Sequence, residues 1–272
     1  FLLGVCRHMQ GDHVAALRLM DASIALNPKV PSSHYNRGLA LQEMGRLAEA
    51  VDSYSRAIDL QPNHVLACNN RGNALLQLGR HEAAVGSFEQ AIKFKPDYAQ
   101  AYINRGQALF ALQRIEAAMA SYDQALALVP GSIDAYLQWA VTLGESGRFE
   151  AALSCFDKVI ATRPEVATAH NNRGAMLLNL KRYDEALASF DRANVLTPDY
   201  ANAHCNRGLA LHGLERFDAA LAAFDQAILL NGEFSGAYFN RALTHQKCRR
   251  FVQAITDHEQ AIALNPNFAE AY

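Results

Sequence analysis

The sequence predicts an all-α fold made of antiparallel helix pairs that repeat every 34 residues. Three observations lead to this prediction. A motif of asparagine, arginine and glycine recurs at that spacing, small residues recur at two positions of each period, and a proline closes most periods. A fixed period of this length is typical of one structural unit stacked many times, and not of a globule with a single core.

The recurring motif sets the register of the repeat. It stands at 36–38, 70–72, 104–106, 172–174 and 206–208. Asn240-Arg241-Ala242 is a near match, and Gln138-Trp139-Ala140 fills the remaining slot. We number each unit from the residue five before the motif. The complete units are then 31–64, 65–98, 99–132, 133–166, 167–200, 201–234 and 235–268.

We expect a single array over 1–272, cut from a longer protein. Residues 1–30 supply positions 5–34 of an earlier unit, and residues 269–272 begin a later one.

Each unit is expected to hold two helices, helix A over positions 2–14 and helix B over positions 17–30. Glycine or alanine at position 8 and alanine at position 20 allow two helices to cross closely. A proline at position 32 of six units ends helix B, because proline cannot continue a helix. Gly45, Gly79 and Gly147 lie in the turn, where a left-handed backbone is easiest for glycine. An aromatic core residue stands at position 24 of six units: Tyr54, Phe88, Tyr122, Phe156, Phe190 and Phe224.

With these residues the chain resembles a tetratricopeptide repeat array over essentially its whole length. The resemblance implies a right-handed superhelix, an α-solenoid, with helix A lining its concave surface. Two departures from the family pattern are local. Position 7 is arginine where the family usually has leucine, and position 4 is histidine or cysteine in several units. The last unit carries His245 and His258 at core positions, so we expect it to pack less well.

Position 6 is the strongest functional signal, because it is an amide in all seven units. A helical wheel places it opposite the core stripe of positions 4, 8 and 11, so we expect it to be exposed. A carboxamide can bond both the C=O and the N–H of one peptide unit. The pattern favours a ladder that holds a peptide backbone, although recent duplication of the repeats would also leave a constant asparagine. The ladder residues are Asn36, Asn70, Asn104, Gln138, Asn172, Asn206 and Asn240.

The chain is similar here to the repeat arms of O-GlcNAc transferases, whose asparagine ladder grips extended peptides. That similarity implies peptide contacts by the six asparagines of the column, with Gln138 interrupting it. Flanking positions 5 and 9 are expected to add selectivity, through Asn69, Asn73, Gln107 and Asn171. No basic column like those that hold the C-terminal carboxylates of chaperones stands at the flanking groove positions, so binding of a chaperone tail is not expected.

Two arginine columns have structural explanations. Arginine at position 7 lies beside the junction between neighbouring units, so we expect it to pair with the acidic column at position 25. Arginine at position 16 lies at the turn and is expected to be solvated. Trp139 replaces arginine in the middle unit, as a packing variant or alternatively as a contact for a partner.

Composition excludes several classes of function. A formal charge of −2 argues against a nucleic-acid binder, and no apolar run is long enough to span a membrane. The five cysteines show no CxxC pair, which favours free thiols in a reducing compartment and hence a cytoplasmic location. The histidines do not gather at ligand spacing, and no phosphate loop or nucleophile motif is present. We therefore expect no metal, no cofactor and no catalysis.

The sequence thus predicts a non-catalytic scaffold that binds a partner protein or an extended peptide in its groove. Two alternatives stay open. The chain could be the substrate-recognition arm of a larger glycosyltransferase, or a structural repeat that self-associates through uncapped ends.

Overall fold

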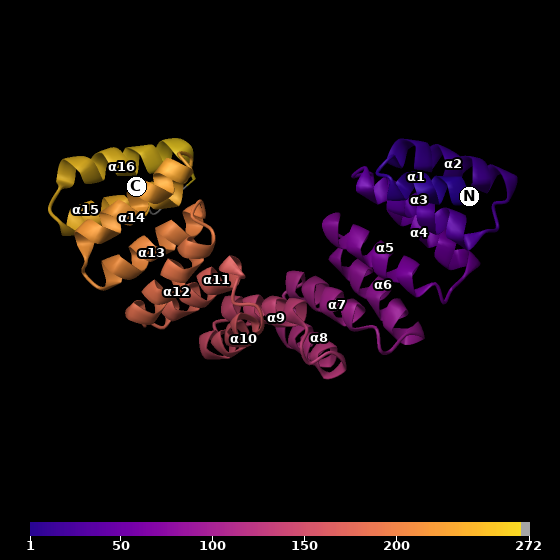
Figure 1. The fold of residues 1–272 in the computed structure, drawn as a ribbon, viewed down its shortest axis with the longest axis horizontal. Coiled ribbons are helices and arrows are strands. Elements are labelled where there is room, and N and C mark those ends of the chain that lie inside the picture. The colour runs from indigo at the N-terminus through magenta and orange to yellow at the C-terminus, as the bar shows by residue number, and fades with distance from the viewer. Residues whose placement is uncertain (268–272) are drawn as a thin grey trace. The chain divides into compact units, whose positions relative to one another are not determined.

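The computed structural model describes residues 1–267, which are helical apart from short turns (Figure 1). Two classes of helix alternate along the chain. The A helices are α1 (Leu2–Met9), α3 (Pro31–Glu43), α5 (Val65–Gln77), α7 (Ala99–Ala111), α9 (Ile133–Glu145), α11 (Ala167–Asn179), α13 (Ala201–Gly213) and α15 (Ser235–Lys247). The B helices are α2 (His13–Leu26), α4 (Leu47–Leu60), α6 (His81–Phe94), α8 (Ile115–Leu128), α10 (Phe149–Thr162), α12 (Tyr183–Leu196), α14 (Phe217–Leu230) and α16 (Phe251–Leu264).

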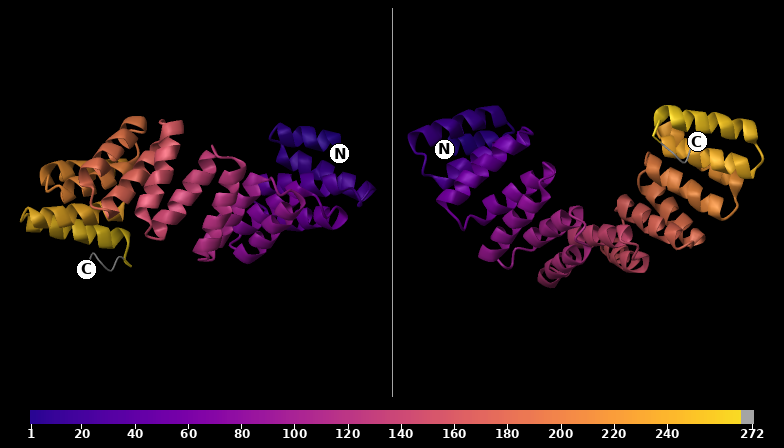
Figure 2. Two further views of the ribbon diagram at one scale, coloured as in Figure 1. Left: turned by 90° about the horizontal axis from the view of Figure 1, so that it is seen from below. Right: turned by 180° about the vertical axis from the view of Figure 1, so that it is seen from behind.

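The helices form two compact units, Phe1–Gln138 and Trp139–Tyr272, with the division inside α9. Within the first unit, each helix from α1 to α8 packs against the next one along the chain, and the same holds from α10 to α16 in the second (Figure 2). A helices of neighbouring repeats also touch, as α5 touches α7 and α11 touches α13. Each unit therefore has one face that is lined by A helices.

The predicted helix boundaries are right for the B helices and shifted by one residue for the A helices. Helix α4 runs over positions 17–30 as expected, whereas α3 runs over positions 1–13. The turn explains the earlier end. The Arg46 N–H bonds the Leu41 carbonyl at 2.9 Å and the Gly45 N–H bonds that of Gln42, which is a Schellman motif around a left-handed residue. Where glycine is absent, the left-handed residue is Gln113, Lys181, Glu215 or Arg249.

Glycine at position 8 lets helix A lie directly against the aromatic ring of its own helix B. A Cβ atom added to Gly72 would stand 2.5 Å from the Phe88 ring, far inside van der Waals contact. Gly38, Gly106, Gly174 and Gly208 meet the rings of their own repeats in the same way. The rings at position 24 are fully buried, so this contact forms the centre of each repeat.

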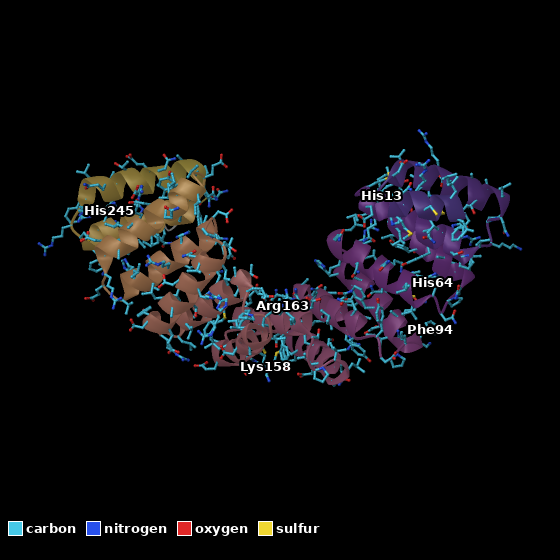
Figure 3. All side chains as sticks on the ribbon, viewed as in Figure 1. His13, His64, Phe94, Lys158, Arg163 and His245 are labelled. Atoms are coloured by element: carbon cyan, nitrogen blue, oxygen red, sulfur yellow. The ribbon has the colours of Figure 1, made fainter. Side chains whose placement is uncertain are left out.

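The last repeat departs from this pattern. His258 replaces the aromatic ring, stands edge-on to Phe239 and shares a hydrogen bond of 3.1 Å with Gln246. His245, on α15 (Figure 3), replaces the leucine of position 11. The Nδ1 atoms of both histidines are buried and find no hydrogen-bond partner among residues 1–267, which fits the expectation of weaker packing.

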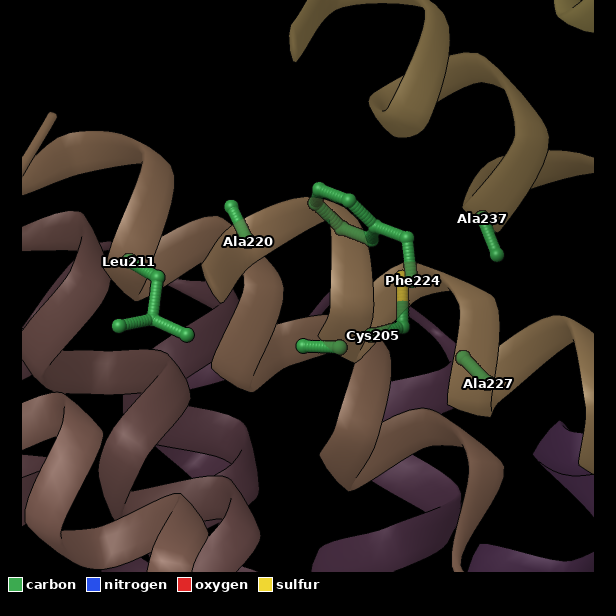
Figure 4. Packing of buried hydrophobic residues seen from close by; sticks show 7 residues of the cluster. Cys205, Leu211, Ala220, Phe224, Ala227 and Ala237 are labelled. Atoms are coloured by element: carbon green, nitrogen blue, oxygen red, sulfur yellow. The ribbon is translucent and has the colours of Figure 1, made fainter. Parts of the chain in front are cut away.

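Within each compact unit, neighbouring repeats share clusters of buried residues. In Figure 4 the Phe224 ring of α14 lies among Cys205 of α13, Ala227 of its own helix and Ala237 of α15. Position 3 is a fully buried alanine in six of the 34-residue repeats, among them Ala203 and Ala237. Inside each compact unit, helix A of one repeat thus completes the core of the repeat before it.

Candidate functional site

The amides at position 6 lie on the A-helix face but are not exposed as the wheel predicted. Asn104 is only 6% exposed, and the other members of the column are half-buried. The prediction was wrong because the wheel considered contacts with helix B alone. Helix A also packs against the A helices of neighbouring repeats, which covers part of its opposite side.

Most asparagines of the column bond the preceding repeat. Asn104 donates from Nδ2 to Asn69 Oδ1 at 3.1 Å, and Asn206 donates to Asn171 Oδ1 at 3.0 Å. Asn70 donates to the Tyr35 hydroxyl at 3.2 Å, and Asn240 makes a longer contact of 3.8 Å to Cys205 Sγ. In all four cases the acceptor is at position 5 of the preceding repeat, 35 residues earlier. We call each such bond an amide tie.

In the first unit the ties join into a chain of amides. Gln100 donates to Asn104 Oδ1, Asn104 donates to Asn69, Asn69 donates to Asn70 Oδ1, and Asn70 donates to Tyr35. A shorter chain in the second unit runs from Asn206 through Asn171 to Asn172. Linked amides polarise one another, so these chains hold the A-helix face rigid.

The acceptors of the ties are neutral. Burial is the main cause that raises the pKa of the Tyr35 hydroxyl, and burial raises the pKa of the Cys205 thiol to about 11. Asn36 follows a repeat whose position 5 is Phe1, which has no acceptor, and it donates instead to its own Ser32 carbonyl at 2.8 Å. The residue at position 5 therefore decides whether a tie forms.

The flanking amides fall into two classes. Asn69 and Asn171, expected to face the groove, are 4% and 6% exposed and serve as acceptors beneath the face. Asn73 and Gln107, at position 9, are half-buried on the face itself. The signal that could have revealed this difference is the Asn-Asn doublet at 69–70 and 171–172, which puts a donor and an acceptor on consecutive positions.

An asparagine that makes a tie keeps part of its bonding capacity. A primary amide has two N–H donors and one oxygen. Asn206 uses one N–H on Asn171, which leaves the second N–H and Oδ1. The tie thus fixes the orientation of the Asn206 amide while the groups needed to pair with a peptide unit stay available.

The second unit has two hollows on its A-helix face, one repeat apart. One, of about 450 Å³, lies between α11 and α13 and is lined by Ala175, Asn206 and Leu209. The other, of about 520 Å³, lies between α9 and α11 and is lined by Val141, Asn172 and Met176. Position 9 of one repeat and position 6 of the next line both hollows, so the register is the same.

Polar acceptors border these hollows. Asn179 lines both hollows. Because its Nδ2 donates to the Ala175 carbonyl at 2.9 Å, its Oδ1 is the atom that can accept a hydrogen bond from a ligand. His212 shares a hydrogen bond of 2.9 Å with Thr244 Oγ1, which itself donates to the Asn240 carbonyl. The imidazole must then donate from Nδ1 and keep Nε2 as an acceptor. Burial first, and then Lys247, lowers the pKa of His212, which favours this neutral form.

Arginine at position 7 binds the acid at position 25 of the preceding repeat, as predicted, in four cases. The distances are 2.7 Å for Arg37–Asp21, 2.7 Å for Arg173–Asp157, 2.6 Å for Arg207–Asp191 and 2.5 Å for Arg241–Asp225. Arg37 and Arg173 also donate to a serine 16 residues later, Ser53 and Ser189. Arg71, whose preceding repeat has Ser55 at this position, donates to Ser87 and Gln90. This arginine therefore joins repeats and is not a groove residue.

The remaining singled-out residues have structural partners as well. The solvated arginines of position 16 form exposed ion pairs, such as Arg46–Glu49 at 2.7 Å and Arg250–Asp218 at 3.0 Å. His34, His170 and His204 each bond the carbonyl of the proline six residues earlier, at 2.8 to 3.0 Å. Trp139 is half-buried, and its indole nitrogen is enclosed without a hydrogen-bond partner.

Two absences hold for the described part of the chain. Within residues 1–267, no three His, Cys, Asp or Glu side chains come together as a set of metal ligands. In the same range, every helix is too short or too polar to cross a bilayer.

The fold and this face define the class of protein. The tetratricopeptide repeat family matches residues 9–65, 35–99, 69–133, 137–201, 201–234 and 235–268. The chain therefore belongs to the tetratricopeptide repeat family. Repeats of this family generally mediate interactions with proteins or peptides and typically act as non-catalytic scaffolds.

Solved structures share the fold at low sequence identity. A tetratricopeptide repeat protein from Parabacteroides merdae is 21% identical over 89% of this chain and 95% of its own, with a TM-score of 0.68. YrrB, described as having an unusual peptide-binding site, is 24% identical over 68% of this chain and 95% of its own, with a TM-score of 0.55. Yeast Tom70 is 21% identical over 96% of this chain and 56% of its own, with a TM-score of 0.62. No curated protein matches this chain.

Proposed function

We propose that the A-helix face binds an extended segment of a partner protein, whose backbone bonds the position-6 amides while its side chains enter the hollows between repeats. The observation that carries this proposal is the register of the two hollows in the second unit. Each is bordered by a position-6 asparagine, Asn172 in one and Asn206 in the other. Backbone contacts and side-chain pockets would then alternate along a bound strand.

The chemistry of the hollows limits the kind of peptide segment that would bind. Their walls are mainly apolar, with Val141, Met176 and Leu209 among them, so they suit aliphatic side chains. Their polar borders include the Asn179 oxygen and His212 Nε2, which accept hydrogen bonds. Backbone N–H groups of the bound segment would supply the matching donors.

The expected affinity is modest. One net hydrogen bond contributes about 0.5–1.5 kcal/mol. Asn206 has one tie already made, so it offers a peptide at most its second N–H and its oxygen, and the oxygen of Asn172 already accepts from Asn171. Association itself costs at least about 4 kcal/mol, so the amides alone give weak binding that tolerates many sequences. Selectivity must come from the hollows. The resemblance to YrrB, whose peptide-binding site is described as unusual, is in keeping with such a role.

A peptide array probed with paired variants tests the proposal. Asn172→Ala combined with Asn206→Ala should weaken binding about tenfold for every bound peptide, because backbone contacts do not depend on peptide sequence. Ala175→Leu should fill one hollow. It should abolish binding only of those peptides whose side chain enters that hollow. Leucine occurs at the same position in Leu39, Leu209 and Leu243, so this variant should fold normally.

A matched control separates a ligand contact from a structural tie. Asn171→Leu removes the acceptor of the Asn206 tie and the donor to Asn172 Oδ1 but leaves both ladder amides in place, and leucine occurs at this position as Leu137. Binding by this variant should stay close to that of the unmodified protein. If Asn171→Leu and Asn206→Ala weaken binding equally, the column acts by holding repeats together and the proposed backbone contact is wrong.

A further inference from the structure

A third hollow lies away from the amide column, where α12, α13 and α14 meet. It centres on Asn194 of α12, at position 28 of its repeat. Every other repeat has an aliphatic residue at position 28: Ile24, Ile58, Ile92, Leu126, Ile160, Ile228 and Ile262. A carboxamide has therefore replaced an aliphatic side chain at a packing position of this one repeat.

Within the described residues 1–267, the amide of Asn194 has no hydrogen-bond partner. Both Nδ2 and Oδ1 are buried, and neither makes a hydrogen bond. A buried amide without partners is destabilising compared with an aliphatic side chain of similar size, so packing alone does not explain the asparagine. A group that binds at this place would supply the missing hydrogen bonds.

The same hollow occurs elsewhere in the chain in a smaller and differently lined form. Between α2 and α4, Ile24 occupies the position of Asn194, and Asp52 and Ser53 line a space of about 320 Å³. Around Asn194, the residues corresponding to Asp52 and Ser53 are Ala222 and Ala223, and the space is about 540 Å³. Four lining residues differ from the counterpart: Ala222 and Ala223 are smaller than Asp52 and Ser53, Asn194 replaces Ile24, and Gln226 replaces Arg56.

The loss of the serine also changes Arg207. Arg37 and Arg173 donate to a serine 16 residues later, but the residue 16 after Arg207 is Ala223. Arg207 bonds Asp191 through Nε at 2.6 Å, so the Nη groups have no such acceptor within this repeat. Because Asp191 balances the charge of Arg207, the hollow as a whole is close to neutral.

We propose that this hollow is a second binding site and takes a primary carboxamide, the side chain of an asparagine or glutamine of a partner protein. A carboxamide can pair with the Asn194 amide through two hydrogen bonds, and its oxygen can also accept from Arg207. A carboxylate would face Asp191, and an aliphatic side chain would leave Asn194 unpaired. The Asn194 amide is shielded from solvent, so it meets the ligand by turning about its side-chain bonds into the hollow that it lines.

Nuclear magnetic resonance titration of the complete chain tests this site. The probe is N-acetyl-glutamine N-methylamide, and acetate and N-methylacetamide serve as the carboxylate and secondary-amide comparisons. The glutamine probe should shift the side-chain amide signals of Asn194 and Gln226 and the backbone signals of Ala222 and Ala223. Both comparison compounds should bind at least about tenfold more weakly, because each loses hydrogen bonds to Asn194.

Asn194→Ile is the matched variant, since it restores the residue of the other repeats and should fold at least as stably. It should abolish the shifts at Ala222 and Ala223. Equal shifts in this variant, no shifts with the glutamine probe, or tighter binding of acetate would each overturn the proposal. Slowly exchanging water at the Asn194 amide together with no response to the probe would mean that the site holds solvent only.

Discussion

The three residues of the recurring motif have three separate roles. Glycine admits the aromatic ring of helix B, as Gly72 does for Phe88. Arginine pairs with the preceding repeat, as Arg173 does with Asp157. Asparagine forms the amide ties on the A-helix face, as Asn104 does with Asn69. The glycine contact lies within one repeat, whereas the contacts of arginine and asparagine are with the preceding repeat.

Gly72→Ala tests the close contact at position 8. Its Cβ atom would stand 2.5 Å from the Phe88 ring, so helices α5 and α6 must separate. The free energy of unfolding, measured in urea, should fall by about 1–3 kcal/mol. Gly86→Ala in the same repeat is the control, because its Cβ atom would meet nothing within 4 Å and should instead stabilise the helix by about 0.5–1 kcal/mol. Equal effects of the two variants would contradict the packing argument.

Residue periodicity predicted the core better than it predicted the candidate site. The buried aromatic ring, the small residues at the helix crossing and the Arg–acid pairs can be predicted by aligning the sequence of one repeat with that of the next. The burial of Asn104 does not, because it depends on contact between successive A helices. The hollow at Asn194 could have been noticed as the one amide in an aliphatic column, but its size and the missing partners require coordinates.

At the scale of the helix pair, the turn is fixed by backbone bonds more than by side-chain caps. The N–H of position 16 bonds the carbonyl of position 11 in every described turn, for example from Arg80 to Leu75 at 2.9 Å. That bond needs a left-handed residue at position 15, which is why glycine or an unbranched polar residue stands there. Sequence therefore located the turn correctly while misplacing the end of helix A by one residue.

The α15–α16 pair should lose stability in mild acid. Burial is the first cause that lowers the pKa of His245; Arg241 and Arg250 also lower it, and Asp257 opposes them. The unfolded chain then binds a proton more readily than the folded pair, so the free energy of unfolding falls as the pH drops below the ordinary histidine pKa of about 6.5 and is fully retained above it. Hydrogen exchange of α15 and α16 at pH values on both sides of that point measures the effect.

His245→Leu should remove this acid sensitivity of the pair. Leucine occupies position 11 in the six other complete units, so the variant also replaces a buried imidazole that has an unpaired Nδ1. The expected gain is about 1–3 kcal/mol near neutral pH. Exchange rates in α3 and α4 serve as an internal reference, and an unchanged pH profile of α15 and α16 would show that another group titrates.

Across the molecule, stability should follow from contacts between neighbouring repeats. Within each compact unit, repeats pack against their neighbours, and clusters of buried residues join helices of adjacent repeats. In such arrays the total stability is approximately a sum of repeat and interface contributions. The contribution of a given residue type at a given repeat position to the free energy of unfolding should then increase with the extent to which neighbouring repeats bury it.

Position 21 offers a direct comparison between the interior of the array and its last described helix. Leu221 is 6% exposed beneath the following repeat, whereas Ile255 is 58% exposed on α16. Leu221→Ala should lower the free energy of unfolding by about 2–5 kcal/mol, and Ile255→Ala should change it by less than about 0.5 kcal/mol. Denaturant unfolding of both variants at low and high protein concentration distinguishes two states of the α16 face. If Ile255→Ala is nearly neutral at both concentrations, solvent covers that face. A loss that grows with concentration would mean that a second copy of the chain covers it, because only an intermolecular contact depends on the concentration of the protein.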